Sequence, residues 1–346
     1  MIKRLTVKFY PTLLGLFVLL LLASCASPTE APPAAPSLTG PYLGQPLPGS
    51  EAQIFAPELI STGLSTRDVA MTPDGSEFYF GVSMGNFHYA TIAFTKRVGG
   101  VWSPPEVVDF CRDARYVNAE PHITPDGKRL LFLSTRPIPG QDEKGNQDIW
   151  AVDRVDDGWG EPYNLGAPIN TKGGEFFPSV TNDGTLYFTR SPEGTRENYI
   201  FRSRRVDGVY QEPEKLPAPL NTSPLHFNAF VAPDESYLIV PTTREDTLGG
   251  IDYYIFFRGD DGKFGEAINM GPTVNSAAGP EWSPYVSRDG KYFFFMARAR
   301  DGKPAEPALL DWKTLLELQR SSKNGDSNIY WVDASFIEKL RPHVED

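Results

Sequence analysis

The segment TPDGKRLLFLSTR at residues 124–136, followed by QDIWAV at residues 147–152, decides the fold of this 346-residue chain. An Asp-Gly pair stands between two apolar segments in the first stretch. Asp-Gly favours a tight turn, because Gly adopts positive φ without steric cost and the Asp side chain accepts hydrogen bonds from the turn. The second stretch holds aromatic and β-branched residues, which strands favour. Together they predict a β-hairpin followed by a third strand.

The same pattern recurs at intervals of about fifty residues, as expected of a repeat architecture. Apolar segments flank each turn, and an aromatic third strand follows. A fourth strand comes after a Gly-containing turn in four of the five repeats. Four antiparallel strands make one blade of a β-propeller. The turn aspartates are Asp74, Asp126, Asp183, Asp234 and Asp289.

The fifth repeat lacks a fourth strand of its own. Residues 56–60, ahead of the first repeat, match the fourth-strand pattern of residues 105–108 and 213–216. We therefore expect the N-terminal segment to supply the outer strand of the last blade, which leaves no open sheet edge. The sequence predicts an all-β fold over residues 55–346. It is a five-bladed β-propeller of four-stranded antiparallel blades, with its ring closed by an N-terminal strand.

The two opening stretches resemble the WD40-like repeat of the TolB-like β-propeller family. The resemblance covers about residues 56–346 and is strong in the second, third and fifth repeats. The fourth repeat departs from it with Glu235 in place of Gly, and the first has Met84 where Arg136, Arg190 and Arg244 end the second strand elsewhere. The six blades and separate N-terminal domain of TolB itself are not visible here, so the role of TolB in the Tol system is not expected of this chain.

The first residues carry export signals. A basic start precedes an apolar run at residues 13–23, which is far shorter than the roughly 20 residues that span a bilayer. Residues 1–24 are therefore interpreted as a signal peptide. The sequence LASC at residues 22–25 resembles a bacterial lipobox, which implies a lipid on Cys25. An ordinary signal peptide with a chance Cys is the alternative.

Residues 25–54 are interpreted as a Pro/Ala-rich tether that holds the folded body away from a membrane. Inner-membrane lipoproteins often carry Asp directly after the lipidated Cys, where this chain has Ala26. By that resemblance we expect a lipid-anchored protein of the cell envelope, in the outer membrane, facing the periplasm or the surface.

The composition argues against several partners and ligands. The formal net charge is −11 at pH 7, and no basic patch interrupts it, so we expect no nucleic-acid partner. Cys111 has no disulfide partner if Cys25 is lipidated, and we interpret it as buried and inert. The four histidines lack zinc-site spacing, and the acidic loop at residues 142–148 lacks a full calcium-binding pattern. We expect no cofactor, no metal and a monomer.

Two further features have competing interpretations. Residues 301–326 form an insertion in the last blade, within which Asp311 is expected to cap a helix over residues 312–320 with an apolar face. That helix is interpreted as a lid on the edge of the ring, or else as a docking helix for a partner. The GVSMG motif at residues 81–85 matches the nucleophile elbow of serine hydrolases, but residues 86–94 predict a strand where an elbow needs a helix.

The candidate site lies where the innermost strands begin. Counted back from each turn aspartate, the positions eight and six residues earlier are mostly polar. Residues two apart share one face of a strand, and innermost strands surround the channel of a propeller. We therefore expect these side chains to converge at one channel mouth. The predicted ligand-binding residues are Arg67, Asp68, Glu120, Glu175, His226 and Glu281.

Three interpretations of this ring remain open: strand-end caps in a polar funnel, a binding site for a peptide, glycan or metal, and a catalytic pair. We predict a non-catalytic, membrane-anchored lipoprotein that binds a protein or cell-envelope ligand. The alternative is a carbohydrate-active hydrolase using carboxylates among Glu175, Glu281, Asp68 and Glu120. Such chemistry requires one carboxyl group with a raised pKa and a second about 5 to 9.5 Å away.

Overall fold

The computed structural model describes residues 38–138, 140, 145–156, 158–298, 307 and 310–342. The chain divides into two compact units, Met1–Pro36 and Ser37–Asp346, and every described residue belongs to the second. The predicted signal peptide, the predicted lipidation site Cys25 and part of the tether lie outside the described residues. Within the described part of the chain, no helix combines the length and the apolar character needed to cross a membrane.

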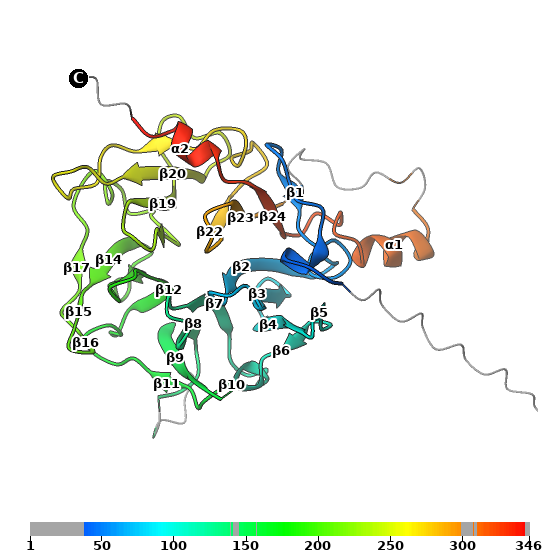
Figure 1. The fold of residues 1–346 in the computed structure, drawn as a ribbon, viewed down its shortest axis with the longest axis horizontal. Helices are drawn as coiled ribbons and strands as arrows, with labels where there is room; N and C mark the ends of the chain where they lie inside the picture. The colour runs from blue at the N-terminus through cyan, green and yellow to red at the C-terminus, as the bar shows by residue number, and fades with distance from the viewer. Residues whose placement is uncertain are drawn as a thin grey trace, which may run out of the picture. The chain divides into compact units, whose positions relative to one another are not determined.

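Five antiparallel sheets form the blades of a β-propeller, as the sequence predicted (Figure 1). Blade 1 contains β2 (Ser65–Met71), β3 (Glu77–Met84), β4 (Tyr89–Val98), β5 (Val101–Trp102) and β6 (Glu106–Val107). Blade 2 contains β7 (Asn118–Ile123), β8 (Arg129–Ser134), β9 (Asp148–Val155), β10 (Gly158–Trp159) and β11 (Tyr163–Asn164). Blade 3 contains β12 (Gly174–Val180), β13 (Leu186–Ser191), β14 (Tyr199–Ser203) and β17 (Glu214–Lys215), with a small hairpin of β15 (Arg205–Val206) and β16 (Val209–Tyr210) beside it.

The last two blades complete the ring. Blade 4 contains β18 (Phe230–Val231), β19 (Tyr237–Thr242), β20 (Asp252–Phe257) and β21 (Ile268–Asn269). Blade 5 contains β22 (Trp282–Val286), β23 (Tyr292–Ala297), β24 (Asn328–Asp333) and β1 (Gln53–Ile54). The inner strands β2, β7, β12, β18 and β22 contact one another in that order, and β22 contacts β2 again. They therefore surround a common axis, which is the channel of the propeller.

The Asp-Gly turns form as their chemistry predicts. In blade 2 the Asp126 carboxylate accepts hydrogen bonds from the Thr124 hydroxyl at 2.6 Å and from the Lys128 N–H at 3.1 Å. Gly127 follows with a φ of 72°, which a side chain would strain. Glu235 takes this position in blade 4 with a φ of 60°, and its carboxylate bonds the Tyr187 hydroxyl at 2.6 Å. The exception to the repeat thus links blade 4 to blade 3.

An N-terminal strand closes the ring, as predicted, although it lies a few residues earlier than expected. Strand β1 pairs with β24, with Gln53 opposite Trp331 and Ile54 opposite Tyr330. The predicted strand at residues 56–60 is wrong in detail, because Ala56 begins a turn in which its carbonyl accepts from the Ile60 N–H at 2.9 Å. Closure depends on aromatic packing: the Phe55 ring lies 4.9 Å from Phe78 and 5.0 Å from Trp331, centroid to centroid.

Helices are few and peripheral. Two short 3-10 turns are η1 (Tyr42–Gly44) and η2 (Asp109–Cys111), and a short helix α2 (Phe336–Lys339) follows the last strand. The predicted insertion helix is present as α1 (Trp312–Gln319), and the Asp311 carboxylate caps it by accepting from the Thr314 N–H at 2.7 Å. No residue of α1 is buried, so the interpretation of this helix as a lid packed on the ring is wrong.

Candidate functional site at the channel mouth

Each inner strand is distorted at the position six residues before its turn aspartate. In blade 1, Arg67 pairs with Gly81 and Val69 pairs with Phe80, so Asp68 is an extra residue that forms a β-bulge. The same shift occurs in blades 2, 3 and 5. All five residues at this position have left-handed backbone angles: Asp68 (φ 55°), Glu120 (58°), Phe177 (50°), Asn228 (48°) and Ser283 (62°). Five non-glycine residues held in this conformation around one axis mark the mouth as a specialised region.

The bulge separates the residues eight and six positions before each turn aspartate, which a regular strand would place on one face. Residues two apart share a face only in a regular strand, and here the intervening backbone turns by one extra residue. Glu175, His226 and Glu281, eight residues before their turns, are almost completely buried. The structure does not bring these three together with Arg67, Asp68 and Glu120, and their predicted role in ligand binding stays a prediction.

These three side chains instead bond the loop that enters their own blade. The Glu175 carboxylate accepts from the Thr171 N–H at 3.0 Å and from Arg190 Nε at 2.9 Å. His226 Nε2 accepts from the Ser223 N–H at 3.1 Å, and the Ser276 hydroxyl donates to Glu281 at 2.7 Å. Burial lowers the pKa of His226 to about 4, with Arg244 and Lys215 adding to the effect, so this imidazole is neutral at pH 7.

The other three predicted residues do meet, and they form one buried network. Arg67 donates from Nε to Asp68 Oδ1 at 2.8 Å and from Nη2 to Glu120 Oε1 at 3.3 Å. The Ser283 hydroxyl also donates to Asp68 Oδ1, and the Phe177 N–H donates to Glu120 Oε2 at 2.8 Å. The bulge residues of four blades are thus linked through hydrogen bonds and one guanidinium. Gly81 lies opposite, where a Cβ would come within 2.8 Å of Asp68 Oδ2.

The network holds one carboxyl group close to half protonation at neutral pH. The pKa of Glu120 is raised to about 7, because burial and the nearby Asp68 carboxylate raise it by more than the Arg67 guanidinium lowers it. Because Glu120 is bonded to Arg67 and to a backbone N–H, gain of its proton changes the charge of the network near pH 7.

Aromatic side chains surround the outer end of this network. A pocket of about 240 Å³ opens over Arg67, Glu120 and Asn228, which we call the mouth pocket. The Arg67 guanidinium lies 5.3 Å from the Phe87 ring centroid and 5.6 Å from the Trp282 ring. Its aromatic walls are Phe87, Phe176, Phe227 and Trp282. The mouth therefore combines flat apolar surfaces with a small polar floor, as small-ligand sites do.

The sequence carries a signal for these walls at one further position of the repeat. Arg67, Phe176, Phe227 and Trp282 all stand seven residues before their turn aspartates, and Ala119 is the fifth member. This is the residue directly before the bulge. In a regular strand, the residue seven positions before the turn aspartate faces away from the residues eight and six positions before it. Strand alternation alone therefore gives no reason to place it at the mouth.

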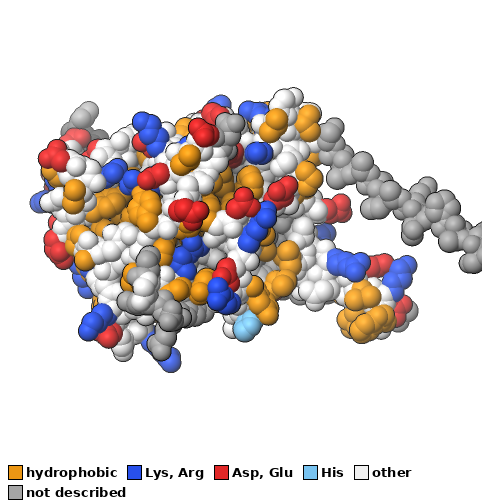
Figure 2. All heavy atoms as spheres, turned by 90° about the horizontal axis from the view of Figure 1, so that it is seen from below, with side chains coloured by type: hydrophobic (Ala, Val, Ile, Leu, Met, Phe, Trp, Pro, Cys, Tyr) orange, Lys and Arg blue, Asp and Glu red, His pale blue; other side chains and the backbone are white. Residues whose placement is uncertain are grey.

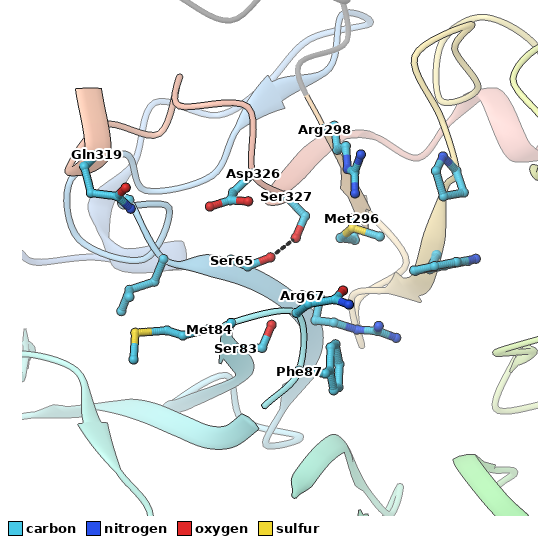
Figure 3. A pocket seen from close by; sticks show the side chains of 16 residues that line it. Ser65, Arg67, Ser83, Met84, Phe87, Met296, Arg298, Gln319, Asp326 and Ser327 are labelled. Atoms are coloured by element: carbon cyan, nitrogen blue, oxygen red, sulfur yellow. Dashed lines mark hydrogen bonds between the residues drawn. The ribbon is translucent and has the colours of Figure 1, made fainter. Parts of the chain in front are cut away.

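A second pocket, of about 340 Å³, adjoins the first between blades 1 and 5; we call it the side pocket (Figure 3). It shares Arg67, Phe87 and Trp282 with the mouth pocket. From there it extends past Ser65 and Ser327, whose hydroxyls are hydrogen-bonded, to Gln319 at the end of α1. The two pockets therefore offer a continuous surface from the channel mouth toward the insertion.

The structure bears on three other features of the sequence. No group of three His, Cys, Asp or Glu side chains able to hold a metal occurs among the described residues, and part of the acidic loop lies outside them. Cys111 is buried and burial raises its thiol pKa to about 12, which suits the predicted inert role. The GVSMG motif joins β3 to β4 in a hairpin, so it is not a nucleophile elbow.

Comparisons with known proteins identify no family for the chain. No protein-family model and no curated protein matches the chain. Among solved structures, TolB from Acinetobacter baumannii is 14% identical with a TM-score of 0.44, over 78% of this chain and 57% of that chain. An α-L-arabinofuranosidase from Lactobacillus brevis is 11% identical with a TM-score of 0.46, over 79% and 91% of the two chains. A gluconolactonase from Xanthomonas campestris is 14% identical with a TM-score of 0.44, over 75% and 82%.

All three TM-scores lie below 0.5, so these likenesses carry no argument about function. The chain also spans little more than half of the TolB structure. The evidence that bears on function is the set of residues at the channel mouth.

Proposed function

We propose that this protein is a lipid-anchored cell-envelope protein whose propeller binds, without chemical conversion, an envelope ligand at the channel mouth. The anchor is the lipid expected on Cys25. The ligand contacts the aromatic walls and the polar floor of the mouth pocket. The observation that carries the proposal is that four aromatic side chains line one pocket together with Arg67, Glu120 and Asn228.

The mouth favours a ligand with both flat apolar faces and hydrogen-bonding groups. Phe176, Phe227 and Trp282 offer ring faces, while Gln147 and Asn228 offer amide donors and acceptors. A pocket of about 240 Å³ holds one sugar ring or one side chain of a peptide rather than a protein surface. The adjoining side pocket extends this surface, so a linear glycan or peptide fits better than an isolated small molecule.

The position of Arg67 supports binding over hydrolysis. A glycosidase needs its two carboxyl groups on opposite sides of the bond to be cleaved. Here the Arg67 guanidinium is bonded to both Asp68 and Glu120 and occupies the space between them. Glu175 and Glu281, which the hydrolase alternative also used, are engaged with loops. Burial raises the pKa of both Glu120 and Glu175, and a carboxyl group with a raised pKa favours the hydrolase.

The test is a pull-down from detergent-solubilised membranes with the full-length chain as bait. The wild type is compared with the double variant Phe176→Ala/Phe227→Ala, and the matched control is Trp312→Ala, an aromatic change outside both pockets. We expect the wild type and the control to retain the same glycan or peptide, identified by mass spectrometry, and the double variant to lose it. Equal retention by all three proteins would remove the mouth from ligand binding.

The hydrolase alternative is tested with the ligand that the wild type retains. Incubation with purified wild type should leave the ligand intact. Cleavage that disappears in both Asp68→Asn and Glu120→Gln, and persists in Trp312→Ala, would establish the hydrolase instead.

A further inference from the structure

Helix α1 presents an apolar face that the propeller does not cover. Trp312 is 75% exposed, and Leu315 and Leu316 are 46% and 42% exposed; Leu310, two residues before the helix, is 68% exposed. Trp312, Leu315 and Leu316 stand three and four residues apart, so they share one side of the helix. In Figure 2 this apolar side projects from the body at the lower right. Monomeric proteins rarely leave such a cluster in water without a partner.

The helix is fixed to the propeller by its C-terminal end. The Asn324 amide donates to the Gly63 carbonyl at 3.0 Å, and a Cβ on Gly63 would collide with the Gln319 carbonyl. The apolar face is therefore held in a fixed orientation rather than carried on a free loop. The segment that holds it, just before β2, belongs to the N-terminal part of the chain.

The proposed lipid anchor keeps this side of the propeller close to a membrane. The first described residue, Leu38, accepts from the Trp102 N–H at 2.9 Å at the outer edge of blade 1. Figure 1 places the N-terminal segment and α1 on the same side of the ring. Thirteen residues, counted from Cys25 to Leu38, span at most roughly 45 Å when fully extended. A face on this side thus stays within reach of the bilayer that holds the lipid.

The charges beside the apolar face suit a membrane surface. Lys313, Arg320 and Lys323 are exposed at its border, and Lys313 is paired with Glu317 at 3.7 Å. Helices that lie in the interface carry Trp and Leu on one side and basic residues at the margin. Trp is also enriched at the level of lipid headgroups.

We propose that the apolar face of α1 rests in the surface of the lipid bilayer and acts as a second membrane contact beside the lipid on Cys25. The inference depends on the anchor in the proposed function and does not depend on the mouth ligand. The short tether raises the local concentration of bilayer at α1, so a contact that is weak alone becomes populated. Because Gln319 lines the side pocket, this contact also places that pocket beside the membrane.

The experiment uses full-length lipidated protein in vesicles of phosphatidylethanolamine and phosphatidylglycerol. An environment-sensitive fluorophore is attached through Leu316→Cys, and the matched control is Val206→Cys. Val206 is also exposed but lies in β15, on the opposite side of the ring in Figure 1. The buried Cys111 thiol, with its raised pKa, does not compete for the label. Vesicles with and without quencher-bearing lipids are compared.

We expect lipid-borne quenchers to reduce the emission at residue 316 at least several-fold more than at residue 206. We also expect Trp312→Ser/Leu315→Ser to abolish that difference. Equal weak quenching at both positions would overturn the inference. Burial of residue 316 in detergent that increases with protein concentration would also overturn it, because it would show that a second copy of the chain covers this face. Failure to co-sediment with vesicles would remove the anchor and the inference together. Ligand capture at the mouth, measured in detergent, is unaffected by any of these results.

Discussion

Two sets of carboxylates occupy positions two residues apart in the inner-strand repeat, in different blades, and the fold uses them differently. Asp68 and Glu120, at the bulge, meet under an aromatic pocket and share Arg67. Glu175 and Glu281, two positions earlier in their blades, are buried against the loops that enter those blades. A carboxylate near the axis of a propeller is therefore not by itself a sign of a site. The local backbone decides whether it faces the mouth or holds a loop.

The largest expected effect comes from removing a loop-holding carboxylate. Glu175→Ala should lower the free energy of unfolding by about 3 kcal/mol, because it leaves the largely buried Arg190 guanidinium without its charge partner. Chemical denaturation measures the change, with the exposed Glu193→Ala in the neighbouring loop as control. A loss as small as that of the control would show that Glu175 is not a structural residue.

The pH dependence of the free energy of unfolding distinguishes Glu120 from carboxylates with an ordinary pKa. The pKa of Glu120 is raised from 4.5 to about 7, so the folded protein keeps a proton that the unfolded chain loses. The unfolded chain binds fewer protons between these values, so the free energy of unfolding should fall as pH rises from about 4.5 to 7, by up to about 3 kcal/mol, and then level off.

Glu120→Gln should remove this pH dependence, because an amide does not titrate in this range. Denaturation curves of wild type and variant across pH 5 to 8, with the exposed Glu197→Gln as control, make the comparison. An unchanged slope in Glu120→Gln would assign the titration to another group and would weaken the account of the network.

Removal of an aromatic wall of the mouth pocket should lower ligand affinity more than it lowers the stability of the fold. Trp282→Ala removes a wall shared by both pockets and one ring beside the Arg67 guanidinium. We expect affinity for the captured ligand to fall roughly 30-fold, which corresponds to about 2 kcal/mol for a central aromatic contact. Calorimetric titration of the wild type and the variant measures it. Affinity within a factor of two of wild type would exclude Trp282 from the binding surface.

A single added methyl group at Gly81 tests the difference between the mouth carboxylates and the loop-holding carboxylates. A Cβ at Gly81 would come within 2.8 Å of Asp68 Oδ2 but touches none of the loop-holding residues. Gly81→Ala should therefore alter stability by less than about 1 kcal/mol while displacing the carboxylate and weakening ligand binding. The exposed Gly49→Ala, with open space around it, serves as control. Loss of stability without loss of binding would contradict this reading.

Much of the fold was predictable because its determinants are local. The Asp-Gly turns, the aromatic third strands and the N-cap of α1 each follow from a few neighbouring residues, and all are present. The closing strand was placed at residues 56–60 because they match the fourth-strand pattern of other repeats, whereas the long-range pairing with β24 selects Gln53–Ile54.

The sequence pattern indicated the polar residues of the mouth but not its aromatic residues, and the reason is physical. Polarity singled out Arg67, Asp68 and Glu120, which the structure brings together, but gave no reason to choose Phe176, Phe227 and Trp282. Each bulge moves one side chain out of the alternating pattern on which the prediction relied. Phe87 comes from a hairpin in which residues 86 and 87 both have positive φ, which also lies outside strand periodicity.

The most direct test measures ligand retained per folded molecule for two double variants at adjacent positions of the inner-strand repeat. Phe176→Ala/Phe227→Ala changes the mouth, and Glu175→Gln/Glu281→Gln changes the loop-holding positions. The account predicts that the first variant folds and loses the ligand, while the second melts at a lower temperature and keeps it. Retention by the aromatic variant together with loss by a fully folded carboxamide variant would contradict the account and move the site to the buried glutamates.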